Sequence, residues 1–186
     1  MDAFIASTLL VALAEIGDKT QLLSFVLAAH LRRPWAIIAG ILVATLANHA
    51  LAGWVGTLIA EFSSPETMRW VTGIVFIAFG LWTLKPDELD DDAPKNTSAG
   101  AFVTTTIAFF IAEMGDKTQF ATIALAAKYD ALVWVVAGTT LGMLAANVPA
   151  VLIGEKLAHR LPLKQIRWAA AAVFVATGVL TLAGIA

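Results

Sequence analysis

Two closely similar heptapeptides indicate how this chain is organised: Glu15-Ile16-Gly17-Asp18-Lys19-Thr20-Gln21 and Glu113-Met114-Gly115-Asp116-Lys117-Thr118-Gln119. The copies lie 98 residues apart (113 − 15). About thirty of the first 88 positions are identical at this offset, whereas composition alone predicts about ten. We interpret the chain as a duplication, with one repeat over 1–85, a second over 101–186, and an acidic linker over 86–100 between them.

The composition is that of an integral membrane protein. Of 186 residues, 59% are hydrophobic and 14% are charged, and the mean hydropathy is +0.81. Soluble domains are about 45–50% apolar and about 25% charged, and a soluble domain of this size lacks the interior to bury so much apolar surface. With a net charge of −2, the chain does not have the excess of basic residues that is typical of a nucleic-acid-binding protein. Because the chain has no Cys, disulfides and thiolate metal sites are excluded.

The apolar stretches predict an all-α protein with six transmembrane helices. A helix that crosses the bilayer needs about 20 mostly apolar residues, and six stretches separated by short polar turns meet this need. The predicted spans are Ala3–Ala29, Trp35–Glu61, Trp70–Leu84, Ala101–Ala127, Leu132–Lys156 and Trp168–Ile185.

Each repeat contains three spans, and this odd number predicts that the repeats cross the membrane in opposite directions. Inverted repeats of this kind are common in secondary transporters. Eight loop Lys and Arg residues lie opposite the N-terminus, and two, Arg69 and Lys128, lie on its own side. Because cytoplasmic loops carry the excess of positive charge, we expect both termini outside and the linker in the cytoplasm. The acidic start, Met1-Asp2, does not favour a cleaved signal peptide.

Both heptapeptides lie near the middle of an apolar segment, where charge is costly. Each contributes two carboxylates and one ammonium. A central Asp or Lys costs about 2.5–3.5 kcal/mol on insertion, so six such groups cost on the order of 15–20 kcal/mol. Interhelical hydrogen bonds in membranes return only about 0.6 kcal/mol each. We therefore interpret these charges as a functional site rather than as structural ion pairs alone.

The spacing of the acids indicates what the site binds. In each copy the Glu and the Asp are three residues apart, which on a continuous helix places them on one face that the Gln extends by a further three residues. Gly17, between Glu15 and Asp18, leaves room for close helix approach or for an unwound turn. Four carboxylates with amide oxygens form an all-oxygen cage, which suits Mn²⁺ or Ca²⁺. The predicted ligands are Glu15, Asp18, Glu113 and Asp116, with Gln21, Gln119, Asn48 and Asn147 as further candidates.

The charge count of the site favours exchange of a cation for protons. Four carboxylates and two ammoniums sum to −2, which one divalent cation or two protons would neutralise. Crowding of like charges also favours proton uptake by the carboxylates. A site that holds either M²⁺ or protons is a minimal antiporter.

Several side chains allow two interpretations. Lys19 and Lys117 either form ion pairs with Asp116 and Asp18 that hold or gate the two halves, or they take part directly in transport. Asn48 and Asn147 either complete the cation shell or hydrogen-bond a neighbouring helix. A further group of polar side chains either lines the path or has a local role: Thr20 and Thr118, with Ser24 and Thr122, could bond their own helix backbone, and His49 could relay protons or simply pack.

The duplicated E-x-G-D-K-T resembles the signature of a divalent cation/proton exchanger family that includes Golgi and thylakoid manganese/calcium transporters and bacterial manganese exporters. The resemblance covers both halves of the chain. It implies that Glu15, Asp18, Glu113 and Asp116 bind the transported cation, and that transport is coupled to protons. The chain is similar to the compact prokaryotic form, for which we expect Mn²⁺ efflux across the cytoplasmic membrane.

Two other functions fit the same sequence: a passive divalent-cation channel, and a small-solute exporter of similar three-plus-three build. An intramembrane protease is disfavoured because both copies read E-x-G-D with a lysine beside the acid, and we expect no enzyme activity and no resident cofactor. The sequence leaves open Mn²⁺ against Ca²⁺, the number of cation sites, and a monomer against a homodimer. The G-x-x-x-G step at Gly138 and Gly142 favours packing within the chain over dimer formation.

Overall fold

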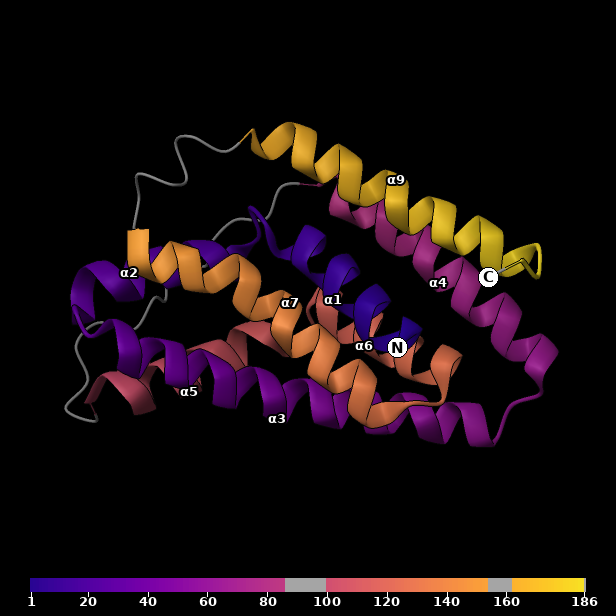
Figure 1. Cartoon of the computed structure of the whole chain (residues 1–186), viewed down its shortest axis with the longest axis horizontal. Helices are drawn as coiled ribbons and strands as arrows, with labels where there is room; N and C mark the ends of the chain where they lie inside the picture. The colour runs from indigo at the N-terminus through magenta and orange to yellow at the C-terminus, as the bar shows by residue number, and fades with distance from the viewer. Residues whose placement is uncertain (86–99, 154–161, 186) are drawn as a thin grey trace.

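The computed structural model describes residues 1–85, 100–153 and 162–185, and these residues form helices and no strand (Figure 1). Each helix of the first half begins 98 residues before a helix of the second half, at 2 and 100, 19 and 117, 34 and 132, and 65 and 163. The described helices are α1 (Asp2–Glu15), α2 (Lys19–Leu31), α3 (Pro34–Glu61), α4 (Pro65–Thr83), α5 (Gly100–Glu113), α6 (Lys117–Tyr129), α7 (Leu132–Ile153) and α9 (Leu163–Leu182).

The helices confirm an all-α chain with the character of a membrane protein. By length and composition, α3, α7 and α9 could each cross a bilayer, and α5 is a shorter apolar helix. Large apolar side chains such as Trp54, Ile111 and Leu152 are exposed on the outer surface, as expected where lipid is the solvent. The number of spans and the inverted relation of the repeats stay predictions. The linker at 86–99 and the basic loop residues Lys95, Lys156 and Arg160 lie outside the described residues.

Two predicted spans are not continuous helices, which corrects the sequence prediction. The segment 3–29 is divided into α1 and α2, and the segment 101–127 into α5 and α6. Each break contains a glycine in the left-handed region, Gly17 with φ +84° and Gly115 with φ +74°. The next residue, Asp18 or Asp116, is extended, with ψ of 168° or 165°. The i to i−4 ladder therefore stops inside the motif and restarts at the lysine. The Glu and the Asp of each motif thus do not share one helix face, contrary to the expectation for a continuous helix, and the unwound turn that Gly17 allowed is present.

Two other predicted boundaries are also wrong. The spans predicted from Trp70 and Trp168 begin five residues earlier, at Pro65 in α4 and Leu163 in α9. The start of α4 is explained by its cap, since Ser64 Oγ accepts a hydrogen bond from Thr67 N–H at 3.2 Å and proline occupies the first helical position. Polar residues in the first turns lower the local hydropathy, so hydropathy alone does not predict either start.

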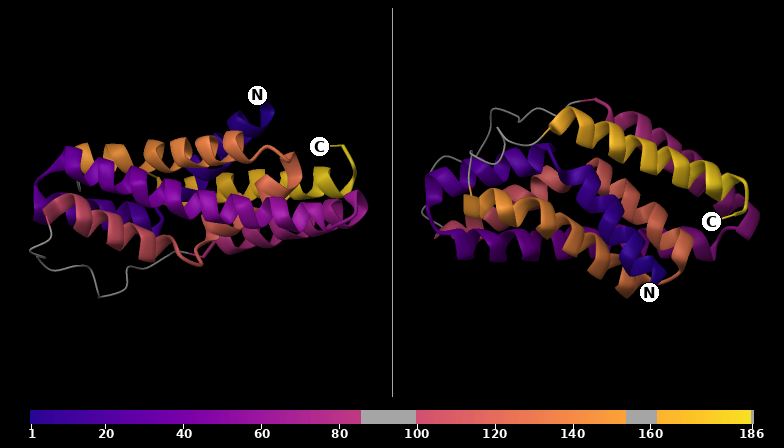
Figure 2. Two further views of the ribbon diagram at one scale, coloured as in Figure 1. Left: turned by 90° about the horizontal axis from the view of Figure 1, so that it is seen from below. Right: turned by 45° about the horizontal axis from the view of Figure 1, so that its top comes forward.

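Small residues let the helices of the two halves approach closely (Figures 1 and 2). Gly138 of α7 lies against Phe4 of α1, where a Cβ would come within 2.5 Å of the Phe4 carbonyl oxygen. Gly142, one turn on, lies against the carbonyl of Thr8. The G-x-x-x-G step therefore packs helices within the chain, as expected. The position 98 residues before Gly138 behaves alike, because Gly40 of α3 lies against the Phe102 carbonyl of α5.

Helices α4 and α9 form a separate, tightly packed pair, side by side in every view (Figures 1 and 2). A Cβ on Gly73 would lie 3.0 Å from the Gly178 carbonyl oxygen, and a Cβ on Gly178 would lie 2.7 Å from that of Gly73. The rings of Phe76 and Phe174 meet between the helices at 6.2 Å.

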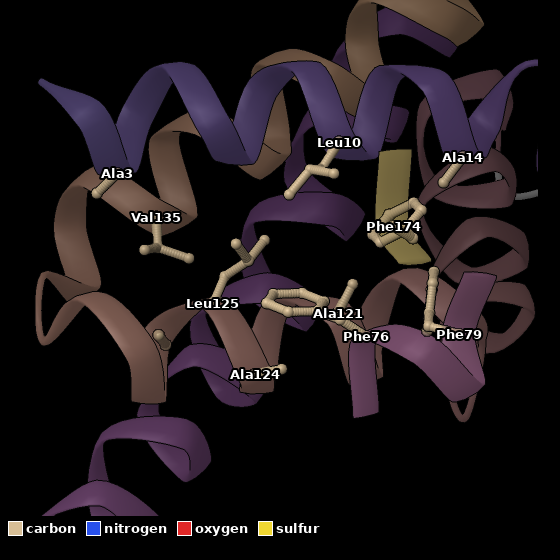
Figure 3. Close-up of a cluster of buried hydrophobic side chains, with 11 residues drawn as sticks. Ala3, Leu10, Ala14, Phe76, Phe79, Ala121, Ala124, Leu125, Val135 and Phe174 are labelled. Atoms are coloured by element: carbon tan, nitrogen blue, oxygen red, sulfur yellow. The ribbon is translucent and has the colours of Figure 1, made fainter. Parts of the chain in front are cut away.

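Two clusters of buried apolar side chains flank the middle of the molecule. The first joins α1, α6 and the start of α7 to the α4–α9 pair, and Figure 3 shows Phe76, Phe79 and Phe174 facing Ala14 and the α6 side chains. The second joins α2, α3, α5 and α7 through Leu23, Leu27, Ile37, Ile41, Ala44, Phe109 and Val151. Ala14, next to Glu15, belongs to the first cluster, and Ala112, next to Glu113, packs against the second.

Candidate cation site

The two helix breaks meet in the middle of the molecule and bring both motifs together. Lys117 Nζ lies 2.7 Å from Asp18 Oδ1, and Lys19 Nζ lies 3.1 Å from Asp116 Oδ1. Each ion pair joins one half of the chain to the other. These are the pairs that the sequence suggested as holding or gating contacts.

Each break is held open by the glutamine of its own motif. Gln21 Oε1 accepts a hydrogen bond from Gly17 N–H at 2.9 Å, and Gln119 Oε1 accepts one from Gly115 N–H at 2.8 Å. The amide of Gln21 also donates to the Ala146 carbonyl of α7 at 3.0 Å. The glutamines therefore satisfy backbone groups that the unwound turn would otherwise leave without partners.

The four motif carboxylates are buried and only half satisfied. Exposure is 0% for Glu15 and Glu113, 3% for Asp18 and 4% for Asp116. One oxygen of each has a partner: Thr20 Oγ1 donates to Glu15 Oε2 at 2.6 Å, Thr118 Oγ1 donates to Glu113 Oε2 at 3.1 Å, and lysines hold the two aspartates. Among the described residues, the other four oxygens have no partner: Glu15 Oε1, Asp18 Oδ2, Glu113 Oε1 and Asp116 Oδ2. Leaving such atoms unpaired is costly unless something else binds them.

Three of the carboxylates are close enough to share one cation. One oxygen from each of Glu15, Glu113 and Asp116 lies within 4.8 Å of the other two. Two oxygens that bind one Ca²⁺ at 2.3–2.6 Å can be at most about 4.6–5.2 Å apart, so the spacing is within reach of a shared ion. Asp18 is outside this group and is held by Lys117 instead.

The two ion pairs differ in burial. The side chain of Lys117 is 4% exposed and that of Lys19 is 27% exposed. The Asp18–Lys117 pair is therefore the more deeply desolvated, and the shorter. The symmetric sequence does not predict this difference between the halves.

Comparison with known proteins assigns the family. A family model described as "Divalent cation/proton antiporter GDT1" matches residues 3–91 and 101–185. The chain belongs to this family. A protein of Vibrio cholerae serotype O1 named "Putative manganese exporter" is 53% identical over 176 residues, covering 94% of this chain and 88% of the relative. A GDT1-like protein of Synechocystis is 31% identical with 89% of each chain covered, and the yeast divalent cation/proton antiporter GDT1 is 24% identical with 94% of this chain and 81% of the relative covered. No solved structure is significantly similar.

The GDT1 family is a family of divalent cation/proton antiporters, as the motifs suggested.

Two further predicted site residues, Asn48 and Asn147, are buried near the motifs. Asn48 accepts from the Gln119 amide at 2.9 Å and donates to the Phe110 carbonyl at 2.9 Å. Asn147 accepts from Ser24 Oγ at 2.8 Å and donates to the Met143 carbonyl at 3.1 Å. These observed contacts are helix-to-helix and local hydrogen bonds, and a place for Asn48 and Asn147 in the cation shell stays a prediction.

Other polar side chains of this GDT1-family chain divide between the site and the packing. Thr20 and Thr118 donate to the motif glutamates, whereas Thr122 donates to the Thr118 carbonyl of its own helix at 2.8 Å. His49 is buried, and neither ring nitrogen has a partner in the described part of the chain.

Sequence reasoning missed two basic residues beside the site. Lys85, just after α4, and Arg167 of α9 line a narrow crevice together with Asp18 and Lys117. The repeat contained a signal, because Arg69-Trp70 and Arg167-Trp168 are equivalent at the 98 offset, but only packing shows which of the two arginines lines the crevice beside Asp18.

Proposed function

We propose that this chain exports Mn²⁺ in exchange for protons, by alternating access at the buried carboxylates. The observation that carries the proposal is the set of four unpartnered carboxylate oxygens contributed by both motifs. Oxygen donors without thiolates suit Mn²⁺ and Ca²⁺. The name of the Vibrio cholerae relative favours Mn²⁺.

The proton step follows from the charge of the site. Within the two motifs alone, Glu15, Asp18, Glu113 and Asp116 supply four carboxylates, and Lys19 and Lys117 supply two ammonium groups. One Mn²⁺ or two protons bring the sum to zero, so the two substrates compete for the same oxygens. In this proposal Glu15, Glu113 and Asp116 form the first binding group, and Asp18 joins when Lys117 releases it.

We also propose that the halves, 1–85 and 101–186, are inverted repeats of three spans each. The equivalent glycine contacts of Gly40 and Gly138 support this relation. With the loop charges, it gives both termini outside, the linker 86–100 in the cytoplasm and the inner membrane as the location. The four carboxylates of one chain lie together, so in this proposal each copy holds its own cation site, in a monomer or in a homodimer.

The test is flux into proteoliposomes, measured separately for Mn²⁺ and Ca²⁺ with and without an imposed pH gradient. Glu15→Gln and Asp116→Asn each remove one ligand charge with little change in shape. Glu66→Gln removes a charge from the exposed first turn of α4 and is the matched control. We expect the pH gradient to drive Mn²⁺ flux in the wild type and the control, and the flux to be lost in both site variants.

Other results would contradict the proposal. Divalent flux that ignores the pH gradient would indicate a channel. The absence of divalent flux from folded protein, with organic-solute flux that survives Glu15→Gln, would indicate a small-solute exporter.

A further inference from the structure

The packing of helices follows the 98-residue offset with two exceptions. At this offset α1 is equivalent to α5, α2 to α6, α3 to α7 and α4 to α9. The contact of α1 with α7 has its equivalent in that of α5 with α3. In the same way α6 on α3 matches α2 on α7, and α1 on α6 matches α5 on α2. The exceptions both involve the α4–α9 pair, because α4 packs on α6 and α9 packs on α1. Their counterparts would be α9 on α2 and α4 on α5, and neither is among the extensive contacts of the described helices.

Individual contacts show the same asymmetry. The rings of Trp82 in α4 and Phe120 in α6 are 6.2 Å apart. A Cβ on Gly17 would lie 3.0 Å from the side chain of Leu163 at the start of α9, whereas one on Gly115 would have no atom within 4 Å among the described residues. The α4–α9 pair therefore covers the motif break at Gly17, and none of the described residues covers the equivalent position at Gly115.

The α4–α9 pair nevertheless obeys the offset internally. Gly80 lies against the Ala171 carbonyl, and the equivalent positions, Gly178 and Gly73, lie against each other. Phe76 and Phe174, which are equivalent, lie against each other in the pair, with ring centroids 6.2 Å apart and ring planes tilted by 39°. The pair therefore has a two-fold relation of its own and can present the same surface to either half of the remaining helices.

We propose that α4 and α9 move as one body between the observed position on α1 and α6 and a second position, in which α9 packs on α2 and α4 packs on α5. This inference rests on the proposed inverted repeat and names the element that performs alternating access. In the second position the pair would pack on α2 and α5, the counterparts of α6 and α1, beside the apolar cluster of α2, α3, α5 and α7.

The observed position closes one route to the carboxylates. Phe76, Phe79 and Phe174 pack against Leu10 and the α6 side chains in the first cluster (Figure 3). Beyond them is a cavity of about 560 Å³ between the ends of α3, α4, α6 and α9, and Lys128 in its wall lies 6.0 Å from the Phe76 ring. Asp18 and Lys117 instead line the crevice at Lys85 and Arg167. In the second position the phenylalanines would withdraw and connect the carboxylates to the cavity.

Contacts expected in the second state are found by replacing each residue of an observed contact with its equivalent 98 residues away. The observed contact of Trp82 with Phe120 predicts a contact of Leu180 with Leu22 in the second state. Lys128 Nζ donates a hydrogen bond to Thr181 Oγ1 at 3.1 Å. The equivalent residues, His30 and Thr83, are therefore predicted to lie close together in the second state.

Because the chain contains no Cys, paired cysteines test this directly in membranes. We expect Trp82→Cys/Phe120→Cys to cross-link with a short thiol-specific reagent and to report the observed state. Leu22→Cys/Leu180→Cys should also cross-link within one chain, with His30→Cys/Thr83→Cys as an independent second pair. Leu180→Cys alone controls for links between two copies. Phe4→Cys/Trp134→Cys, whose native rings are 6.4 Å apart across α1 and α7, joins helices that stay together in both states.

The result that supports the proposal is cross-linking of both kinds of pair, with Mn²⁺ flux lost after the Trp82/Phe120 link and retained after the Phe4/Trp134 link. Failure of both second-state pairs to link, in protein whose observed-state pair does link, would overturn it. So would full flux after the Trp82/Phe120 link. Cross-linking is read on a gel without any flux, so second-state links in a protein that moves no Mn²⁺ would support the motion and contradict only the proposed function.

Discussion

Thr20 and Thr118 are the residues that orient the two motif glutamates. Each hydroxyl donates to one oxygen of a carboxylate that has no other partner among the described residues, and so leaves the second oxygen available for a cation. We expect Thr20→Val to weaken Mn²⁺ affinity by about 10- to 100-fold, because a hydrogen bond to a charged group contributes about 1.5–3 kcal/mol. Thr20→Ser keeps the donor and should stay near wild type. The measurement is the Mn²⁺ concentration dependence of flux, and equal affinities for the Val and Ser variants would contradict this role.

The two lysines should differ in their effect on stability. Lys117→Gln leaves Asp18 charged and buried without its partner, which costs about 3–5 kcal/mol for a buried pair, whereas Lys19 is partly exposed and its loss should cost less. We expect a larger fall in the melting temperature of purified protein for Lys117→Gln than for Lys19→Gln. The double variant Asp18→Asn/Lys117→Gln should recover much of the loss. Equal effects of the two single variants would show that the difference in burial has no energetic consequence.

At residue scale the sequence predicts much of the site. The four carboxylates, both ion pairs and the threonines follow from the motif, its depth and the duplication. The separation of Asp18 from the other three carboxylates does not follow, because repeat arithmetic assigns the same surroundings to both copies. The reach of Arg167 to the crevice depends likewise on packing between distant segments.

At the scale of the elements, the broken helices are the feature that hydropathy could not predict. Glycine is common inside transmembrane helices, so Gly17 alone is compatible with a continuous span. The break depends on Gln21, which accepts from Gly17 N–H and donates to the Ala146 carbonyl of α7. Such a contact, 125 residues away in sequence, is tertiary information. The helix boundaries at the 98 offset, in contrast, follow from the duplication itself.

The glutamines give a prediction at this scale. Gln21→Leu removes the hydrogen bond that links α2 to the Ala146 carbonyl and leaves the part-buried Gly17 N–H without its partner, and an unsatisfied backbone group costs about 1–3 kcal/mol when it is buried. We expect a lower melting temperature and reduced Mn²⁺ flux. Gln165→Leu, on the exposed first turn of α9, is the matched control and should change neither. Wild-type flux in Gln21→Leu would mean that the break does not need its glutamine.

At the scale of the whole molecule, the duplication accounts for the helix order, and the α4–α9 pair is where the halves differ. Membrane orientation belongs to this scale. A cysteine in place of Glu66, at the start of α4, should react with a membrane-impermeant thiol reagent added to intact cells, and one in place of Lys85, just after α4, should react only after the membrane is opened. The reverse pattern would contradict the proposed placement of the termini outside.

We propose that protons and Mn²⁺ exchange at one carboxylate site. The most direct test of this exchange starts without a pH gradient. An imposed Mn²⁺ gradient across proteoliposomes, with the membrane potential clamped to zero, should move protons in the opposite direction, as read by an internal pH dye. Glu15→Gln and Glu113→Gln should abolish both movements, and Glu66→Gln should leave both intact. Movement of Mn²⁺ with no change in internal pH would contradict the exchange mechanism.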